Sequence, residues 1–250
     1  MAGTAVLGRL TWQIGEVKRT ATETPRVRSL VFNVPGWRRH RPGQHVDVRL
    51  TAEDGYQAVR SYSIASPPEE PDVEIAVERL DEGEVSPYLV EQVRPGDRLE
   101  VRGPIGGYFV WDVEQGGPLF LAAGGSGIVP LRAIIRHRIA AGSDVPIRLL
   151  YSTRSPEDVI YRDELDRLAT EGGGIEVVHT FTRSQPSGWS GYGRRIDREM
   201  LEEVAWPPDQ HPLSYVCGPT SFVETAAAYL VALGHDPMHV KTERFGPTGG

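Results

Sequence analysis

The sequence predicts a two-domain protein, an antiparallel β-barrel domain followed by an α/β domain with a doubly wound, parallel sheet. Two observations lead to this prediction. Apolar and polar residues alternate with a period of two through much of residues 1–112, which is typical of half-buried strands. After residue 117, short apolar segments alternate with helical ones, which is typical of a parallel sheet covered by helices. The expected domains are therefore residues 1–112 and 117–250.

The first domain shows the strand pattern in several places. Residues 46–50 and 73–77 carry apolar side chains at every second position. Turn-forming dipeptides separate such segments, namely Pro35-Gly36, Pro42-Gly43, Asp54-Gly55 and Pro95-Gly96. Because glycine and proline favour the backbone angles of tight turns, short strands joined in this way indicate a small antiparallel barrel or sandwich.

The second domain alternates strands and helices. The expected strands are residues 118–123, 147–152, 175–182, 213–217 and 238–243, and the expected helices are residues 128–140, 155–170 and 220–233. In the first of these helices, Ile128, Leu131 and Ile135 recur at helical spacing. No low-complexity linker separates the domains, so we expect them to pack closely.

Composition excludes several classes of function. The net charge of -7 argues against general nucleic-acid binding, which needs a basic surface. No uncharged apolar segment approaches the roughly 18 to 20 residues that span a bilayer, and the N-terminus lacks a secretion signal. We therefore expect a cytoplasmic protein without a membrane span. Cys217 is the only cysteine, which excludes an internal disulfide and an iron–sulfur cluster held by four thiolates of this chain. No metal site is expected.

A glycine-rich turn, residues 124–127, follows an apolar strand and opens a helix. In this context, bare backbone N–H groups and the helix N-terminus can hold a pyrophosphate. The alternative is a turn that serves packing alone, because the motif lacks the Gly-x-Gly-x-x-Gly form.

The alternation in residues 60–66 predicts a strand. It would place Arg60, Tyr62 and Ile64 on one face and Ser61 and Ser63 on the other. By itself this segment could be an ordinary edge strand. Four further segments follow it in a set order, namely residues 103–106, 124–130, 217–219 and 243–245. Together they resemble the ferredoxin–NADP reductase family, and the resemblance covers nearly the whole chain.

The resemblance implies noncovalent FAD in the first domain. Arg60 would pair with the FAD pyrophosphate, Tyr62 would pack on the isoalloxazine, and Ser63 would lie near flavin N5. A second pyrophosphate-binding stretch is implied at Gly83, Val85 and Ser86. Taken alone, that stretch is an ordinary helix N-terminus with a serine cap.

The resemblance also implies a nicotinamide nucleotide in the second domain. The residues it assigns to that nucleotide are Gly125, Ser126, Gly127, Pro130, Gly218 and Pro219. Cys217 would lie beside the nicotinamide, whereas its chemistry alone favours a buried, inert thiol. The resemblance also predicts a preference for NADPH over NADH. Arg154, Thr182 and Arg183 lie where NADP-selective members place groups for the 2′-phosphate. Tyr192, Arg194 and Arg195 are additional candidates for that contact.

Near the C-terminus, Glu243 and Phe245 match an acid-x-aromatic pattern of the family. Glu243, with Ser63 and Cys217, would orient the reacting centre, and Phe245 would stack on the flavin. The alternative is that Phe245 only covers the core beneath the last strand.

The resemblance implies an FAD-dependent NADPH oxidoreductase that passes a hydride to FAD and electrons to a separate acceptor, such as ferredoxin or flavodoxin. The alternatives are a free flavin reductase, the reductase component of an oxygenase or other redox enzyme, and an idle flavin- and nucleotide-binding subunit or sensor. A cysteine-rich ferredoxin module is not expected in this chain. The basic residues Arg38, Arg39 and Arg41 are a candidate docking patch for an acidic protein.

Overall fold

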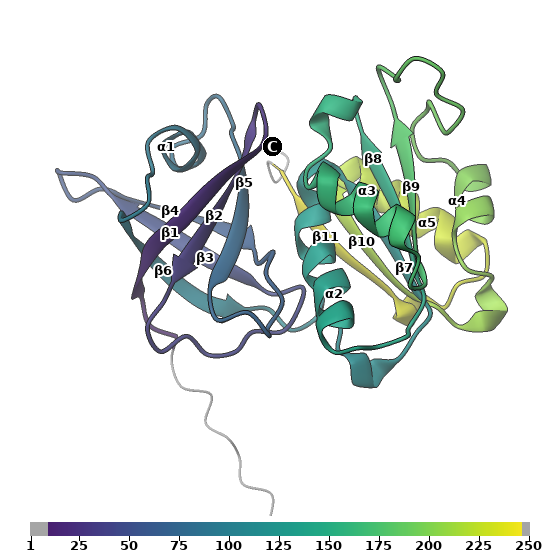
Figure 1. The fold of residues 1–250 in the computed structure, drawn as a ribbon, viewed down its shortest axis with the longest axis horizontal. Helices are drawn as coiled ribbons and strands as arrows, with labels where there is room; N and C mark the ends of the chain where they lie inside the picture. The colour runs from purple at the N-terminus through teal and green to yellow at the C-terminus, as the bar shows by residue number, and fades with distance from the viewer. Residues whose placement is uncertain (1–9, 247–250) are drawn as a thin grey trace, which may run out of the picture.

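A computed structural model describes residues 10–246 as two packed domains, the barrel and the α/β domain of Figure 1. The first is a six-stranded antiparallel sheet in the order β4-β3-β6-β1-β2-β5. Its strands are β1 (Gln13–Thr24), β2 (Val27–Asn33), β3 (His45–Thr51), β4 (Gln57–Ser63), β5 (Val73–Glu78) and β6 (Arg98–Ile105). The two edges meet just after β4, where Ile64 bridges to Ile75 and Ala65 N donates to Glu74 O at 2.7 Å. These contacts curl the sheet into a barrel.

The barrel encloses an apolar core that includes the fully buried Leu30, Phe32 and Ile75. One short helix, α1 (Ser86–Glu91), adds the buried Leu89 to this core. The alternation seen in the sequence therefore has its expected cause, since inward positions of each strand fill the core.

The second domain is a five-stranded parallel sheet in the order β11-β10-β7-β8-β9. Its strands are β7 (Leu119–Gly124), β8 (Ile147–Thr153), β9 (Ile175–Phe181), β10 (Leu213–Pro219) and β11 (Val240–Phe245). Its helices are α2 (Ile128–Ala140), α3 (Arg162–Glu171), α4 (Arg198–Val204) and α5 (Thr220–Ala232). Short 3-10 turns span Val113–Gln115, Gly125–Gly127, Pro156–Asp158, Pro208–Gln210 and Pro237–His239.

The helices cover both faces of this sheet. α2 and α3 pack with Leu121 and Leu149 on one face, and α4 and α5 pack with Phe120 and Leu150 on the other. The chain moves outward from β7 to β9 and then returns to the other side of β7 with β10. In such doubly wound sheets, ligands bind at the carboxyl ends of the strands where the order reverses, which here lies between β7 and β10.

The predicted fold class is confirmed, and the deviations are local. The helix expected at residues 155–170 begins only at Arg162, because residues 155–158 form a capped 3-10 turn and Tyr161 has a φ of 61°. Helix α4 was not predicted. It has seven residues, and its N-cap Asp197 accepts a hydrogen bond from Met200 N at 2.9 Å. Within residues 10–246, none of the helices is long and apolar enough to cross a bilayer.

The two domains are joined through α2, which lies on the side of the α/β domain that faces the barrel (Figure 1). Arg132 of α2 is 6% exposed and binds two carboxylates. One is Glu74 of the barrel, at 2.8 Å, and the other is Glu164 of α3, also at 2.8 Å. The Arg132 guanidinium also lies 3.9 Å from the centre of the Tyr161 ring. A single buried cation thus connects the barrel to two helices of the other domain.

Neighbouring polar contacts extend this connection. Arg136 binds Glu164 at 2.7 Å and Glu70 of the barrel at 3.2 Å. His137 Nδ1 lies 3.0 Å from Glu69. Apolar contacts continue beside the charges, because Val27, Ala65 and Ala76 of the barrel belong to the same buried cluster as the core of the α/β domain. The domain interface is therefore a buried structure with specific charge pairing.

Replacing Arg132 by Met should strongly destabilise the protein. The buried carboxylate of Glu74 would lose its closest cation, and breaking a buried pair in this way costs about 3 to 5 kcal/mol, whereas the half-buried Glu164 would keep Arg136. For a chain of this size each 1 kcal/mol lowers Tm by about 2 to 4 °C, so calorimetry should detect a large drop.

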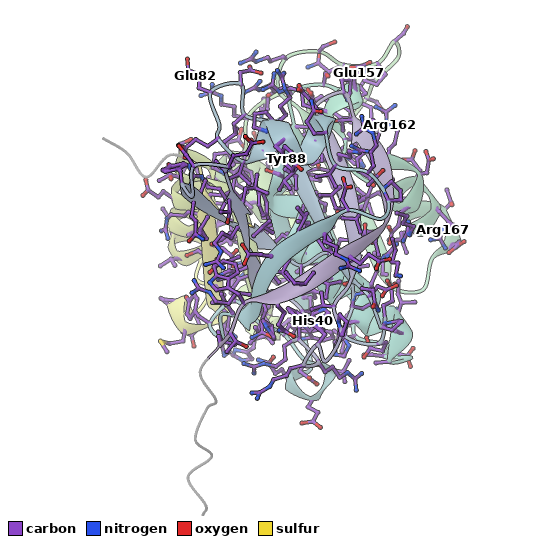
Figure 2. The ribbon with its side chains drawn as sticks, turned by 90° about the vertical axis from the view of Figure 1, so that its left-hand side faces the viewer. His40, Glu82, Tyr88, Glu157, Arg162 and Arg167 are labelled. Carbon is purple, nitrogen blue, oxygen red and sulfur yellow. The ribbon has the colours of Figure 1, made fainter. Side chains whose placement is uncertain are left out.

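The matched control is Arg167→Met, because Arg167 pairs with Glu171 across 3.6 Å while both side chains stay more than half exposed. Figure 2 places Arg167 at the periphery of the molecule. Exposed pairs of this kind contribute about 0 to 1 kcal/mol. Equal changes in Tm for the two variants would contradict a structural role for the Arg132 cluster.

Candidate functional site

A cavity of about 450 Å³ lies at the carboxyl ends of β7 and β8, between the two domains. The barrel contributes Arg26 and Glu78 to its wall. The α/β domain contributes the glycine-rich turn, the segments after β8 and β9, and Phe245 at the end of β11. The cavity therefore occupies the place where a doubly wound sheet binds its ligand.

The glycine-rich turn forms one wall, and all of its residues except Ser126 lack side chains. A Cβ on Gly127 would stand 2.0 Å from Cys217 O, so the turn packs directly on the end of β10. Gly125 has a φ of 55°, a backbone conformation that favours glycine. Gly124, Gly125 and Ser126 line the cavity where α2 begins, and a helix N-terminus at that point favours an anion.

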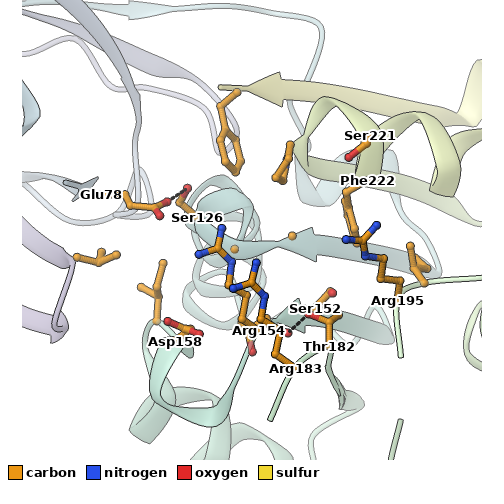
Figure 3. A pocket seen from close by; sticks show the side chains of 18 of the residues that line it. Glu78, Ser126, Ser152, Arg154, Asp158, Thr182, Arg183, Arg195, Ser221 and Phe222 are labelled. Atoms are coloured by element: carbon orange, nitrogen blue, oxygen red, sulfur yellow. Dashed lines mark hydrogen bonds between the residues drawn. The ribbon is translucent and has the colours of Figure 1, made fainter. Parts of the chain in front are cut away.

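Ser126 connects this turn to the barrel. Its hydroxyl donates a hydrogen bond to Glu78 Oε2 at 2.9 Å (Figure 3). Glu78 ends β5, 48 positions away in sequence, and was not among the predicted site residues. No local pattern could have paired it with the turn, since only the packing of the two domains brings them together.

Arginines surround the opposite part of the cavity. Arg154 follows β8 and Arg183 follows β9, and the two segments are joined by a hydrogen bond from Arg183 N to Arg154 O at 2.8 Å. Figure 3 shows both guanidinium groups reaching into the cavity, with Arg195 across from them. Within the described residues 10–246, none of the three is held in a salt bridge. Their charges are therefore available to a phosphate.

The other predicted nucleotide residues lie partly inside and partly outside this cavity. Tyr192 and Arg194 line a separate, shallow surface hollow, and the Tyr192 hydroxyl bonds to Glu203. Pro130 is buried within α2. Thr182 and Pro219 line the main cavity, whereas Gly218 packs against Gly124 behind it.

Ser63, Cys217 and Glu243 come together from the two domains. Ser63 ends β4, and its hydroxyl lies 3.3 Å from Glu243 Oε1 on β11. Cys217 stands beside Glu243 in the strand register. Burial raises the pKa of the Glu243 carboxyl, while the hydrogen bond from Ser63 opposes the rise. Burial and the nearby Glu243 charge raise the pKa of the Cys217 thiol well above its usual value, so the thiol stays protonated.

Tyr62 and Arg60 lie on β4, next to this centre along the chain. Tyr62 packs against the barrel core, and burial raises the pKa of its phenol, which therefore stays neutral. Arg60 is exposed, and its Nη2 donates to Glu84 Oε2 at 2.6 Å. Tyr56 also donates to Glu84, at 2.8 Å.

The stretch after β5 is shaped by Gly83 and Ser86. A Cβ on Gly83 would meet Ser86 Oγ at 2.8 Å, so only glycine leaves the backbone open at this turn. Ser86 begins α1, and its hydroxyl accepts a hydrogen bond from Leu80 N at 3.0 Å. The alternative of a serine cap is therefore wrong, because the N-cap of α1 is the buried Val85 and no side chain caps the helix.

These residues suit a flavin dinucleotide. Arg60 supplies a cation with a planar fork of donors, which matches phosphate oxygens. Gly83 N itself donates to Leu80 O at 2.9 Å, and Tyr62 supplies an aromatic ring beside the barrel core. Among residues 10–246, the His, Cys, Asp and Glu side chains form no group that could hold a metal ion.

Comparisons with known proteins agree with this geometry. Residues 15–110 match the oxidoreductase FAD-binding domain, and residues 121–228 match the oxidoreductase NAD-binding domain. Fold and matches thus define a two-domain oxidoreductase chain with an FAD-binding and an NAD-binding domain. The chain is 35% identical over 209 residues to ferredoxin–NADP reductase B of Sorangium cellulosum, an alignment that covers 81% of this chain and 84% of that protein. The chain belongs to the ferredoxin–NADP reductase family.

Other relatives differ in length. The glycine betaine monooxygenase reductase subunit of Pseudomonas aeruginosa is 33% identical over 211 residues, which cover 83% of this chain and 57% of the relative. The fold is shared with the FAD/NAD binding domain of nitric oxide dioxygenase from Vibrio cholerae, with a TM-score of 0.84 and 24% identity over 94% of this chain and 99% of that one. It is also shared with a ferredoxin NADP+ reductase from Neisseria gonorrhoeae with bound FAD and NADP, with a TM-score of 0.80, 21% identity, and coverage of 93% and 98%.

Replacing Glu243 by Gln should stabilise the protein increasingly as the pH rises. The folded-state pKa of Glu243 is raised above its ordinary value of 4.5, so the ionised carboxyl opposes folding. Below pH 4.5 the two proteins should have similar Tm. As the pH rises from there through the raised folded-state pKa, the Tm of the variant should increase relative to that of the unmodified protein. Thermal unfolding between pH 4 and 9 measures this difference. Glu224→Gln, at an exposed position on α5, is the control. A difference in Tm that does not change with pH would contradict the buried state of Glu243.

Proposed function

We propose that this chain is an FAD-dependent NADPH oxidoreductase that delivers electrons to a separate acceptor. The observation that carries the proposal is the cavity between the domains, which the glycine-rich turn, a set of free arginines and Phe245 line together. Ser63 and Glu243 join the domains at one end of the same interface. Bound flavin would supply the redox chemistry, and the protein would supply position and electrostatics.

We assign the FAD pyrophosphate to Arg60 and to the backbone of Gly83, Val85 and Ser86. Support comes from the exposure of Arg60 and from the turn at Gly83, where a Cβ would clash with Ser86. Tyr62 would give the flavin ring an apolar face, since its neutral phenol already packs on the barrel core. These residues bind and orient the cofactor.

At the reacting centre, Ser63, Cys217 and Glu243 would surround the bound rings with a hydroxyl, a thiol and a carboxyl. The burial of Cys217 and the raised pKa of Glu243 support this role, because both indicate a site shielded from water. Phe245 is half-buried at the edge of the cavity, where its ring would stack on the flavin and have to move to admit the nicotinamide.

The nucleotide assignment favours NADPH. The turn at Gly125, Ser126 and Gly127 would hold the pyrophosphate at the N-terminus of α2. Arg154 and Arg183, with Thr182 between the two strands' ends, would bind the 2′-phosphate, and Arg195 adds a third guanidinium to the same cavity. A free 2′-hydroxyl would give these cations no charged partner.

Replacing Arg154 or Arg183 by Ala should lower kcat/KM for NADPH by about 10- to 100-fold, because a charge-assisted contact contributes about 1.5 to 3 kcal/mol. The value for NADH should stay nearly unchanged. Arg198→Ala, at an exposed position on α4 outside the cavity, is the matched control. Equal losses with both nucleotides would indicate a role in folding or general positioning instead.

We propose ferredoxin or flavodoxin as the acceptor, with docking on basic residues near the domain boundary. The candidates Arg38, Arg39 and Arg41 differ in the structure. Arg39 already binds Glu69 at 2.9 Å, whereas the Arg41 guanidinium lies beside Gly107. Lys241 of the other domain lies close enough to Arg41 for burial and the Arg41 charge to lower its pKa. Arg41 and Lys241 thus concentrate positive charge across the boundary.

A second candidate is the reductase component of an oxygenase. The observation that favours it is the similarity to the glycine betaine monooxygenase reductase subunit, 33% identical, and to a naphthalene 1,2-dioxygenase reductase component from Pseudomonas putida, 27% identical. This candidate differs from the first only in the acceptor protein.

Anaerobic reduction tests the proposal. NADPH should bleach the flavin absorbance of the purified protein within one turnover, and NADH should act more slowly. The reduced protein should then be reoxidised faster by a ferredoxin or flavodoxin than by free FMN. A flavin that NADPH leaves oxidised would contradict an enzyme, and fastest reoxidation by free FMN would identify a free flavin reductase.

A further inference from the structure

Glu84 is placed where it interferes with the principal cation of the proposed FAD site. Its Oε2 accepts the Arg60 Nη2 hydrogen bond at 2.6 Å, and its Oε1 accepts the Tyr56 hydroxyl at 2.8 Å. The second terminal nitrogen of Arg60, Nη1, donates to Val59 O at 2.8 Å. Both ends of the guanidinium fork therefore already have partners within the chain.

The position of Glu84 in the sequence adds to this effect. It lies between Gly83 and Val85, inside the stretch assigned to the pyrophosphate. The same short segment thus carries the backbone donors assigned to a phosphate. It also carries a carboxylate that occupies the place of that phosphate on Arg60. Hydrogen bonds from Tyr56 and Arg60 lower the pKa of Glu84, which keeps the carboxylate charged.

We propose that Glu84 is an internal competitor of the FAD pyrophosphate for Arg60, and that it makes the cofactor exchangeable. The proposal rests on the assignment of FAD to this site. In the free protein the carboxylate holds the guanidinium, and a binding pyrophosphate has to replace it. Both side chains are about half exposed, 50% for Arg60 and 49% for Glu84, so the displaced carboxylate can turn into water. There its repulsion of the phosphate is screened by solvent and salt.

Glu84→Gln tests the competition. Glutamine has the same shape and keeps an acceptor for Tyr56, but it gives up the charge that holds Arg60. Titration of apoprotein with FAD, followed by flavin fluorescence, should show a Kd about 2- to 5-fold lower than in the unmodified protein. The FAD dissociation rate, measured by trapping released FAD with an excess of an FAD-specific apoflavoprotein, should fall correspondingly. Both differences should shrink at high salt.

Glu82→Gln is the matched control. Glu82 is an exposed carboxylate in the same loop, and Figure 2 shows it at the outer edge of the molecule. Its replacement removes the same charge without touching Arg60, so the Kd for FAD should change less than about twofold. An equal decrease in the Kd for FAD in both variants would overturn the proposal, because the change in net charge alone would then explain the tighter binding.

A double-mutant cycle with Arg60→Ala identifies the mechanism. Arg60→Ala should raise the Kd for FAD by about 10- to 100-fold, as expected for loss of a charge-assisted phosphate contact. In that background Glu84→Gln should change the Kd less than about twofold, since no guanidinium is left to compete for. If Glu84→Gln lowers the Kd in this background as much as it does when Arg60 is present, Glu84 does not compete for Arg60 and the proposal is overturned.

Failure of the inference and failure of the proposed function are distinguishable. If the unmodified protein binds no FAD in the titration, the flavin site itself is wrong. If it binds FAD and Glu84→Gln leaves both the Kd and the dissociation rate unchanged, the flavin site stands and the role of Glu84 is refuted.

Discussion

The buried guanidinium of Arg132 holds the two domains together. A buried cation is tolerated only where carboxylates surround it, and Glu74 and Glu164 meet this need from two different domains. The pairing therefore determines how the barrel and the α/β domain sit against each other. Apolar packing of Val27 and Ala76 beside the charges excludes water from the interface.

Domain placement in turn assembles the functional site. Neither domain holds a complete set of functional groups, because Ser63 and Glu78 belong to the barrel while their partners Glu243 and Ser126 belong to the α/β domain. Such contacts require the two domains to be held within a fraction of an ångström. A rigid interface is thus a condition for positioning a flavin against a nicotinamide.

Charge is distributed differently over the two phosphate-binding regions. Within the described residues Arg154 and Arg183 form no ion pair, and the carboxylates that line the same cavity, Glu78 and Asp158, are hydrogen-bonded to Ser126 and Ser155. At Arg60 the chain provides its own anion, Glu84. Under the proposed function, the nucleotide pocket presents unpaired arginines to a substrate that enters at each turnover, whereas the proposed flavin region carries its own counter-charge.

Sequence patterns alone were enough to predict the fold class, most strand and helix positions and the glycine-rich turn, whereas the candidate residues near Arg60 and Glu243 came from the resemblance to the family. These features leave a local record, since strand alternation, helical spacing and glycine turns are visible within a few residues. The sequence missed helix α4, which is short, and it grouped Tyr192 with the nucleotide residues, although the structure places that side chain in a separate hollow. Which distant side chains meet becomes clear only from the folded protein. The bond of Ser126 to Glu78 joins residues 48 positions apart, and the bond of Ser63 to Glu243 spans 180 positions. Such contacts arise from the packing of whole domains, which no local pattern encodes.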